Sequence, residues 1–344
     1  MAVEEVMAVE DAVRGESGVP EEAGRGSRIN WRVAVFAAFT VALAVIFRPW
    51  LVDLWKLSRA NETYSHMPLI PLVSAYLLFA ARARIASAAR SALLPGILIV
   101  GLGGLLFLGG NSLFEPVVRK DILSLSTLAG LVIWLGGFIA LFGVRSFRIA
   151  SFPLLFLLFL VPIPTPLLSI IVDLLQRAST EIANSLFVLL GVPFIRSDFV
   201  FELPGLSVMV ARECSGIRSS ISLFIIGILT AHLCLTSPWR RGILILSVFP
   251  ITVFKNALRV ITLSLLGAYV DQRILASQLH RAGGIPFFVL ALVLFGGVLW
   301  VLKRSEGNAA RKRQTGIPLP SENRPPAAAC QDTLQLPPKE SDAI

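Results

Sequence analysis

The sequence is short of charge and of cysteine. Only 15% of its 344 residues are Asp, Glu, Lys or Arg, whereas 55% are hydrophobic, and the mean hydropathy is +0.75. This composition excludes an ordinary water-soluble domain of the same length. The three cysteines, Cys214, Cys234 and Cys330, are too few and too scattered for a disulfide framework or a zinc site. No other group of residues suits metal or phosphate chemistry, so we expect no cofactor and no metal ion.

The two ends of the chain lack the apolar runs that fill its middle. Residues 1–30 are acidic and polar and contain no apolar core, so we expect no cleavable signal peptide. Neither this segment nor residues 304–344, which are rich in Pro, Ala, Ser and charge, can bury a core. Both are therefore predicted to be disordered cytoplasmic tails, and residues 31–303 to form one membrane domain.

Long apolar runs separated by arginine-containing loops fill this membrane domain. They predict an all-α polytopic membrane protein with about eight transmembrane helices. The expected spans are residues 33–47, 68–80, 93–109, 122–142, 149–161, 217–235, 243–266 and 285–302. The arginines account for the net charge of +9, and their clustering in alternate loops follows the positive-inside rule, so no nucleic-acid partner is expected.

The segment between the fifth and sixth spans decides the topology. Leu167–Leu190 is long enough to cross a membrane, but its apolar residues recur on one side at helical spacing and its other residues are polar. We interpret it as an amphipathic helix on the outer surface, because counting it as a span would place Arg240 and Arg241 outside. Phe199–Leu203 and Leu206–Val210, on either side of Pro204-Gly205, predict a small outer β-hairpin.

Three residues that are far apart in the sequence are expected at the same outer face. Cys214 lies where a polar segment meets the sixth span, and His280 stands five residues before the eighth span. Arg259 follows Arg241 by 18 residues, which corresponds to roughly 27 Å of helix. Since Arg241 marks the cytoplasmic boundary and a hydrocarbon core is about 30 Å thick, Arg259 should lie near the outer interface.

The chemistry of these residue types suits acyl transfer through a thioester. A neighbouring imidazole or guanidinium and the positive end of a helix favour the thiolate of Cys214, the nucleophilic form. Arg259 can stabilise the charge of a tetrahedral intermediate, and His280 can transfer protons. Ser215 and Gly216 would keep the backbone approachable. Arg218, one turn after Cys214, would either tune the thiol or anchor the helix at the interface.

Three ordered motifs resemble the exosortase/archaeosortase family of membrane transpeptidases over residues 31–302. They are Glu213-Cys214-Ser215-Gly216-Ile217-Arg218-Ser219, Asn256-Ala257-Leu258-Arg259-Val260, and His280 with Gly284 four residues later. The earlier Tyr64-Ser65-His66 resembles the first outer loop of the family, although Met67 stands where glycine is common. We expect His66 to shape this loop rather than to perform chemistry.

The resemblance implies a Cys-Arg-His active site formed by Cys214, Arg259 and His280, facing outward from the bacterial cytoplasmic membrane. It also implies substrates among exported proteins that end in a Pro-Glu-Pro-like motif, a membrane helix and a basic segment. The enzyme would cleave near the motif and pass the new carboxyl end to a surface acceptor, often in bacteria that make exopolysaccharide.

Other functions remain open from the residues alone. In a transporter or flippase, Arg259 would bind an anionic substrate, and an internal repeat would favour this reading. A non-enzymatic scaffold for exopolysaccharide export would not need Cys214. A protease that only hydrolyses differs from a transpeptidase in its acceptor, water instead of an amine or a lipid, which leaves no trace in the sequence.

Overall fold

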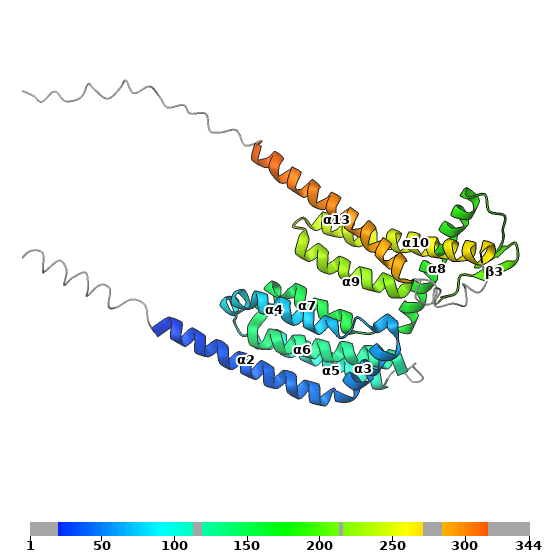
Figure 1. Ribbon diagram of the computed structural model, residues 1–344. Helices are drawn as coiled ribbons and strands as arrows, with labels where there is room; N and C mark the ends of the chain where they lie inside the picture. The colour runs from blue at the N-terminus through cyan, green and yellow to red at the C-terminus, as the bar shows by residue number, and fades with distance from the viewer. Residues whose placement is uncertain (1–19, 113–118, 213–215, 271–283, 316–344) are drawn as a thin grey trace, which may run out of the picture.

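The fold is described for residues 20–112, 119–212, 216–270 and 284–315 by a computed structural model (Figure 1). It is mostly helical, as predicted, with one small sheet. The helices are α2 (Pro20–Ile46), α3 (Arg48–Ala60), α4 (Leu69–Ala88), α5 (Leu93–Ser112), α6 (Arg119–Ile149), α7 (Ser151–Phe156), α8 (Thr165–Leu189), α9 (Ile217–Cys234), α10 (Pro238–Tyr269) and α13 (Gly284–Thr315), with 3-10 turns η1 (Glu62–Tyr64) and η2 (Leu157–Leu160).

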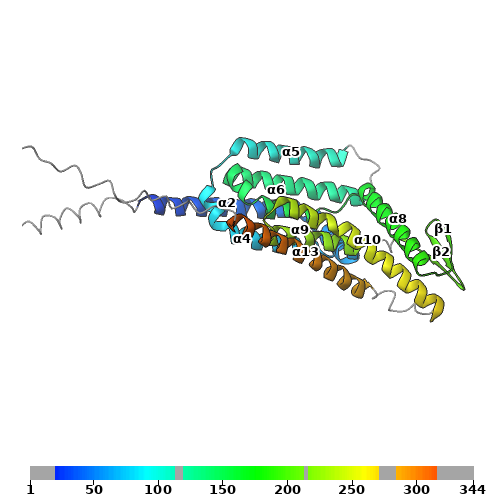
Figure 2. The same cartoon turned by 90° about the horizontal axis from the view of Figure 1, so that it is seen from above.

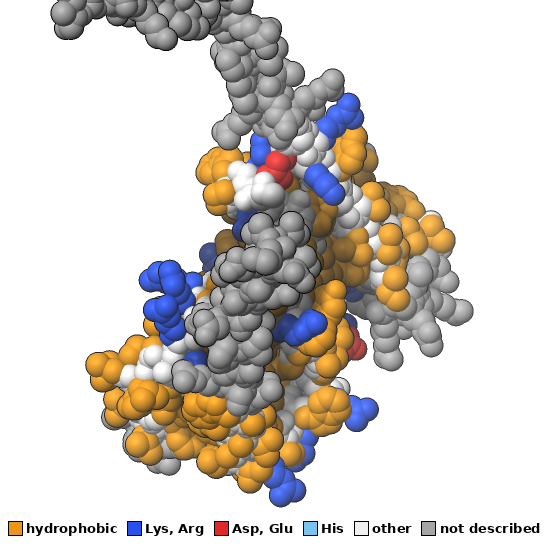
Figure 3. Space-filling view, turned by 90° about the vertical axis from the view of Figure 1, so that its left-hand side faces the viewer, with side chains coloured by type: hydrophobic (Ala, Val, Ile, Leu, Met, Phe, Trp, Pro, Cys, Tyr) orange, Lys and Arg blue, Asp and Glu red, His pale blue; other side chains and the backbone are white. Residues whose placement is uncertain are grey.

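Membrane-spanning helices account for most of the described chain. Six of its helices are long and apolar enough to cross a bilayer, and the number rises to eight if each of two bent helix pairs is one span. The bends are 74° between α2 and α3, and 89° between the α7–η2 segment and α8. The predicted polytopic fold is therefore confirmed. Figure 3 shows broad patches of hydrophobic side chains on the surface, as expected for contact with lipid.

Helix α3 was not expected, because residues 48–66 lie between the first two expected spans, residues 33–47 and 68–80. Its start is nevertheless typical of a helix, since a proline follows Arg48 in the first turn. Trp50, Leu54 and Leu57 recur at helical spacing and pack with Tyr64, Met67 and Leu123. The polar residues of this segment thus form one face of an amphipathic helix rather than a loop.

Close packing joins α5 to α6, which lie side by side in Figure 2. Gly96, Gly103 and Gly110 recur every seventh residue along α5. A Cβ atom on them would lie 2.5 Å from Ala140, 2.6 Å from Ile133 and 2.5 Å from Leu125 of α6, respectively. Because no side chain fits between these backbones, the two helices approach closely, as small residues allow in membranes.

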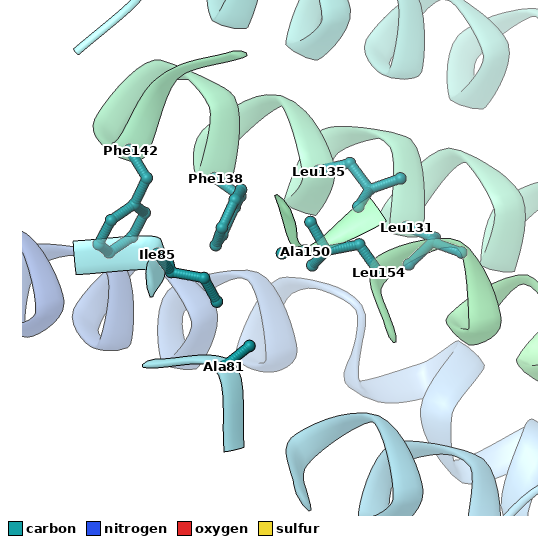
Figure 4. Close-up of a cluster of buried hydrophobic side chains, with 8 residues drawn as sticks. All are labelled: Ala81, Ile85, Leu131, Leu135, Phe138, Phe142, Ala150 and Leu154. Atoms are coloured by element: carbon teal, nitrogen blue, oxygen red, sulfur yellow. The ribbon is translucent and has the colours of Figure 1, made fainter. Parts of the chain in front are cut away.

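A second region of packing joins α4, α6 and α7. Figure 4 shows its buried side chains, which are Ala81, Ile85, Leu131, Leu135, Phe138, Phe142, Ala150 and Leu154. The last turn of α6 follows a break at Gly143, which has a φ of +85° and whose missing side chain makes room for the carbonyl of Arg90. The hydroxyl of Ser146 then donates to the carbonyl of Ile85 at 2.9 Å.

The sheet contains the predicted hairpin and one more strand. Strands β1 (Ile195–Ser197), β2 (Val200–Leu203) and β3 (Leu206–Met209) are antiparallel in the order β1-β2-β3. Gly205 turns the hairpin with a φ of +78°, which glycine adopts readily. Arg196 ties the additional strand β1 to α8 by two hydrogen bonds to Glu181, of 3.1 and 2.6 Å, and this contact raises the pKa of Arg196. Strand β1 was not predicted, because three residues are too few to show the alternation of apolar and polar residues that is typical of a strand.

Helix α8 is amphipathic, as predicted, but its buried face is not its most apolar one. Gln176, Ser179 and Thr180 are buried, whereas Leu174 and Leu189 are 54% and 79% exposed. Farther along, Ala183 and Phe187 pack against the sheet and against α10. Some polar residues of α8 therefore lie inside the protein beside Val172, Leu175, Ala183 and Phe187, whereas the charged Arg177 and Glu181 are exposed.

Candidate active site

The structure describes three of the six residues singled out from the sequence for the site. Arg259 lies on α10, Gly216 caps the N-terminus of α9, and Arg218 belongs to the first turn of α9. Cys214, Ser215 and His280 lie outside the described residues.

The start of α9 rests against the middle of α10. Gly216 has a φ of +78°, and a Cβ atom on it would lie 3.2 Å from Oδ1 of Asn256 and 3.4 Å from Nζ of Lys255. Both the positive φ and this close approach favour glycine here. Arg259 follows Lys255 by one turn of α10. The fold thus brings the second motif, around Arg259, against the helix that begins within the first motif, at Ile217.

Lys255 is a cation inside the protein. Its side chain, in a residue that is only 3% exposed, donates a hydrogen bond to the hydroxyl of Ser219. Among the described residues no carboxylate forms an ion pair with it. The nearest cation on the same face is Arg259, half-buried one turn away. A buried ammonium beside the start of a helix makes this region strongly positive, which favours an anion such as a thiolate.

Asn256 is fully buried, and neither its amide nitrogen nor its carbonyl oxygen has a hydrogen-bond partner in the described part of the chain. Thr252, one turn earlier on α10, is 2% exposed, and its hydroxyl likewise has no partner there. Across from them, Gln176 of α8 donates to the carbonyl of Val210 at 2.6 Å. These side chains make the interior between α8, α9 and α10 polar around Asn256.

Sequence reasoning did not assign Lys255, Asn256 or Thr252 to the site. A signal was present, since polar and charged residues inside an apolar run are costly and are retained for function. Lys255 and Asn256 stand within the same apolar run as Arg259, which was assigned to the site from the sequence. Their burial and their contact with Gly216, however, depend on how α9 and α10 pack, which the sequence does not show.

Arg218 connects α9 to η1, the turn between α3 and α4. It forms an ion pair with Glu62 of η1, and both side chains are more than 60% exposed. Such exposed pairs contribute about 0–1 kcal/mol to stability. This ion pair joins the start of α9 to the segment that contains Tyr64 and His66.

A cavity of about 890 Å³ opens beside these residues. Its lining comes from the segments around η1 and η2 and from α8, α9 and α10, and it is mostly apolar. His66 and Tyr64 line it together with Ser220 of α9 and Thr252 of α10. The cavity continues along α10 to Trp239, near the N-terminus of that helix. Among the described residues, no group of three or more His, Cys, Asp or Glu side chains could hold a metal ion.

Comparison with known proteins gives one match. The family model described as transmembrane exosortase (Exosortase_EpsH) matches residues 50–297, well over half of the chain. No curated protein and no solved structure matches the chain.

Proposed function

Because the chain belongs to the transmembrane exosortase family, we propose that it is a cysteine transpeptidase that processes sorting signals of exported proteins. The members of this family are multi-pass membrane proteins assigned as transpeptidases, and membership implies substrates of the PEP-CTERM type. The substrate would present its motif at the outer face of the cytoplasmic membrane while its helix remains in the bilayer.

The first step is acylation of Cys214. Its thiolate attacks the carbonyl carbon of the scissile peptide, and Arg259 stabilises the oxyanion that forms. The carbon–nitrogen bond then breaks, the leaving amine takes a proton from His280, and the amino-terminal part of the substrate remains bound as a thioester. Gly216, with Ser215 beside it, allows the substrate to approach the backbone at the start of α9.

The second step transfers the acyl group to an acceptor. A nucleophile from the acceptor gives its proton to the now neutral His280 and attacks the thioester carbonyl, and the Cys214 thiolate leaves. If the nucleophile is an amine the product is an amide, and if it is water the product is a carboxylic acid. The proposed acceptor is a lipid or another surface molecule.

One structural observation supports the proposed site independently of family membership. Gly216, two residues after Cys214, lies against Lys255 and Asn256, one turn before Arg259. Two motifs that are 45 residues apart, counted from Cys214 to Arg259, thus converge in space. The positive surroundings and the polar interior at this place suit a thiolate and a charged intermediate.

The proposed orientation and domain limits follow the distribution of arginine. We place residues 1–30 and 304–344 in the cytoplasm as tails of a membrane domain spanning residues 31–303. The active site then faces the periplasm or the outside.

The experiment is co-expression of the full chain with an exported protein that ends in a Pro-Glu-Pro motif, an apolar helix and a basic segment. Replacing Cys214 by Ala should abolish processing, which is followed by immunoblotting of the substrate, because no thioester can form. Cys234→Ala, in a residue exposed at the end of α9, is the matched control and should process normally. Normal processing by Cys214→Ala would refute the nucleophile assignment.

A further inference from the structure

The cavity beside the candidate site has the pattern of a groove that receives a helix. On α9 it is lined by Ile217, Ser220, Ile221 and Phe224. These positions have the spacing i, i+3, i+4 and i+7, so they form one continuous stripe along the helix. Because Ile217 is the first residue of α9, this stripe begins directly beside the proposed nucleophile motif.

A second stripe runs along α10. Trp239, Gly242, Leu246, Phe249 and Thr252 all line the cavity and recur every three or four residues. From Trp239 to Thr252 the helix rises by roughly 20 Å, about two thirds of a hydrocarbon core. Leu246 is 74% exposed and Phe249 is 42% exposed, so no other part of the described chain covers this stripe fully.

Small residues occur at intervals along both stripes. Ser220, Gly242 and Thr252 allow a neighbouring backbone to come close, and small residues are enriched where helices pack in membranes. At Gly242, an added Cβ atom would meet nothing within 4 Å. The groove is therefore open at a point where the backbone of α10 is accessible.

One buried polar atom distinguishes a peptide occupant from hydrocarbon. Thr252 lines the cavity and is only 2% exposed, yet its hydroxyl has no hydrogen-bond partner among the described residues. A buried hydroxyl without a partner is costly. A lipid chain cannot provide that partner, whereas a backbone carbonyl or a small polar side chain of a helix can.

We propose that this groove binds the membrane helix of the substrate. The inference rests on the proposed function. If the scissile bond of the substrate lies at Cys214, the groove is the place for the apolar segment that follows this bond. The helix would lie along α9 and α10, with its outer end at Ser220 and Thr252 and its other end near Trp239. The groove would thus fix how far the cleavage motif reaches beyond the membrane.

The experiment is photo-crosslinking in intact membranes. The full chain carries benzoylphenylalanine at Leu246 in the groove, or at Leu105 of α5 as the control, and is co-expressed with the tripartite substrate described above. The two positions are similarly exposed, at 74% and 69%, but Leu105 does not line the groove. Mass spectrometry should find the substrate helix attached at Leu246 and not at Leu105. Attachment of lipid alone, of a second copy of the chain alone, or of nothing at Leu246 would overturn the proposal, as would equal attachment at Leu105.

A pair of variants tests the same groove without crosslinking. Gly242→Trp should reduce processing by roughly tenfold or more, because the indole occupies the groove while its Cβ meets nothing within 4 Å among the described residues. Gly104→Trp on α5, where an added Cβ also meets nothing within 4 Å, is the control and should process normally. Normal processing by Gly242→Trp together with normal accumulation in the membrane would contradict the proposal.

A Cys214→Ala background separates this inference from the proposed function. Crosslinking at Leu246 should persist in that background although processing stops. If processing continues in Cys214→Ala while Leu246 still crosslinks to the substrate helix, the groove assignment stands and the nucleophile assignment falls. If processing stops and Leu246 never crosslinks to the helix, the groove assignment falls alone.

Discussion

At the scale of single residues, the least expected feature is the buried polar pair on α10. Lys255 has one neutral partner, Ser219, and Asn256 has none among the described residues. Leaving a buried amide group unpaired costs about 1–3 kcal/mol, so such a residue weakens the fold unless something else requires it. We interpret the requirement as catalysis, because both residues contact the start of α9 at Gly216.

This interpretation makes a prediction for Asn256→Leu. The substitution removes polar atoms that have no partner among the described residues, at nearly constant volume, so the melting temperature in detergent should stay the same or rise. Processing of the substrate should fall by about tenfold or more if the amide assists the charged intermediate. Ser179→Ala is the control and should process normally, because it removes another buried polar group, on α8, whose hydroxyl has no partner in the part of the chain that the structure describes. A destabilised Asn256→Leu that still processes normally would show that the amide is structural.

The sequence predicted part of this site and not the rest, for a physical reason. An arginine inside an apolar run is costly enough to be noticed, so Arg259 could be singled out, and Gly216 and Arg218 came with the cysteine motif. The lack of partners for Asn256 and Thr252 among the described residues could not be predicted, because it depends on which helices surround them. Whether Cys214 and His280 approach Arg259 stays a prediction, since both lie outside the described residues.

At the scale of elements, the contact between α5 and α6 depends on glycine. At Gly103 an added Cβ atom would lie 2.6 Å from Cγ1 of Ile133 and 2.9 Å from its backbone nitrogen. At the adjacent Gly104 nothing lies within 4 Å. Neighbouring residues of the same type thus differ only in the helix face that they occupy.

Gly103→Leu should therefore destabilise the protein, by about 3 kcal/mol or more, because the two helices must move apart. Gly104→Leu should leave stability unchanged or raise it by about 1 kcal/mol, since leucine favours helix more than glycine does. Thermal unfolding of the purified full chain in detergent measures both. Equal melting temperatures for the two variants would contradict the packing of α5 on α6.

The elements themselves were predictable to different degrees. Each predicted membrane helix overlaps one or two of the observed helices. These helices could be predicted because burial in lipid requires long apolar runs. Helix α3 and strand β1 were missed, since α3 mixes charge with apolar residues and β1 has only three residues. The burial of Gln176, Ser179 and Thr180 on α8 was also missed. In a soluble protein the apolar face of a helix is buried, but beside lipid and a polar site that preference does not hold.

At the scale of the whole molecule, the account requires the sheet and the start of α9 to lie outside the membrane. The two ends of α9 should then face opposite compartments, because a single helix separates them. Arg240 and Arg241, just inside α10, are expected in the cytoplasm by the charge rule.

Alkaline phosphatase fusions report on this orientation. A fusion after Leu203, at the end of β2, should be active because the enzyme folds only outside the cytoplasm. A fusion after Trp239, at the start of α10, should be inactive. The reverse pattern would move the candidate site to the cytoplasmic face, where an exported substrate could not be passed to a surface acceptor.

The central claim is that Cys214 carries the substrate as a thioester, and mass spectrometry of the acid-quenched full chain tests it most directly. Purified protein would be mixed with a synthetic sorting signal, quenched while processing proceeds, and digested. The account predicts that the peptide containing Cys214 gains the mass of the amino-terminal part of the substrate, and that hydroxylamine removes this mass. Continued processing with Cys214 unmodified, or with the acyl group on another residue, would contradict the account.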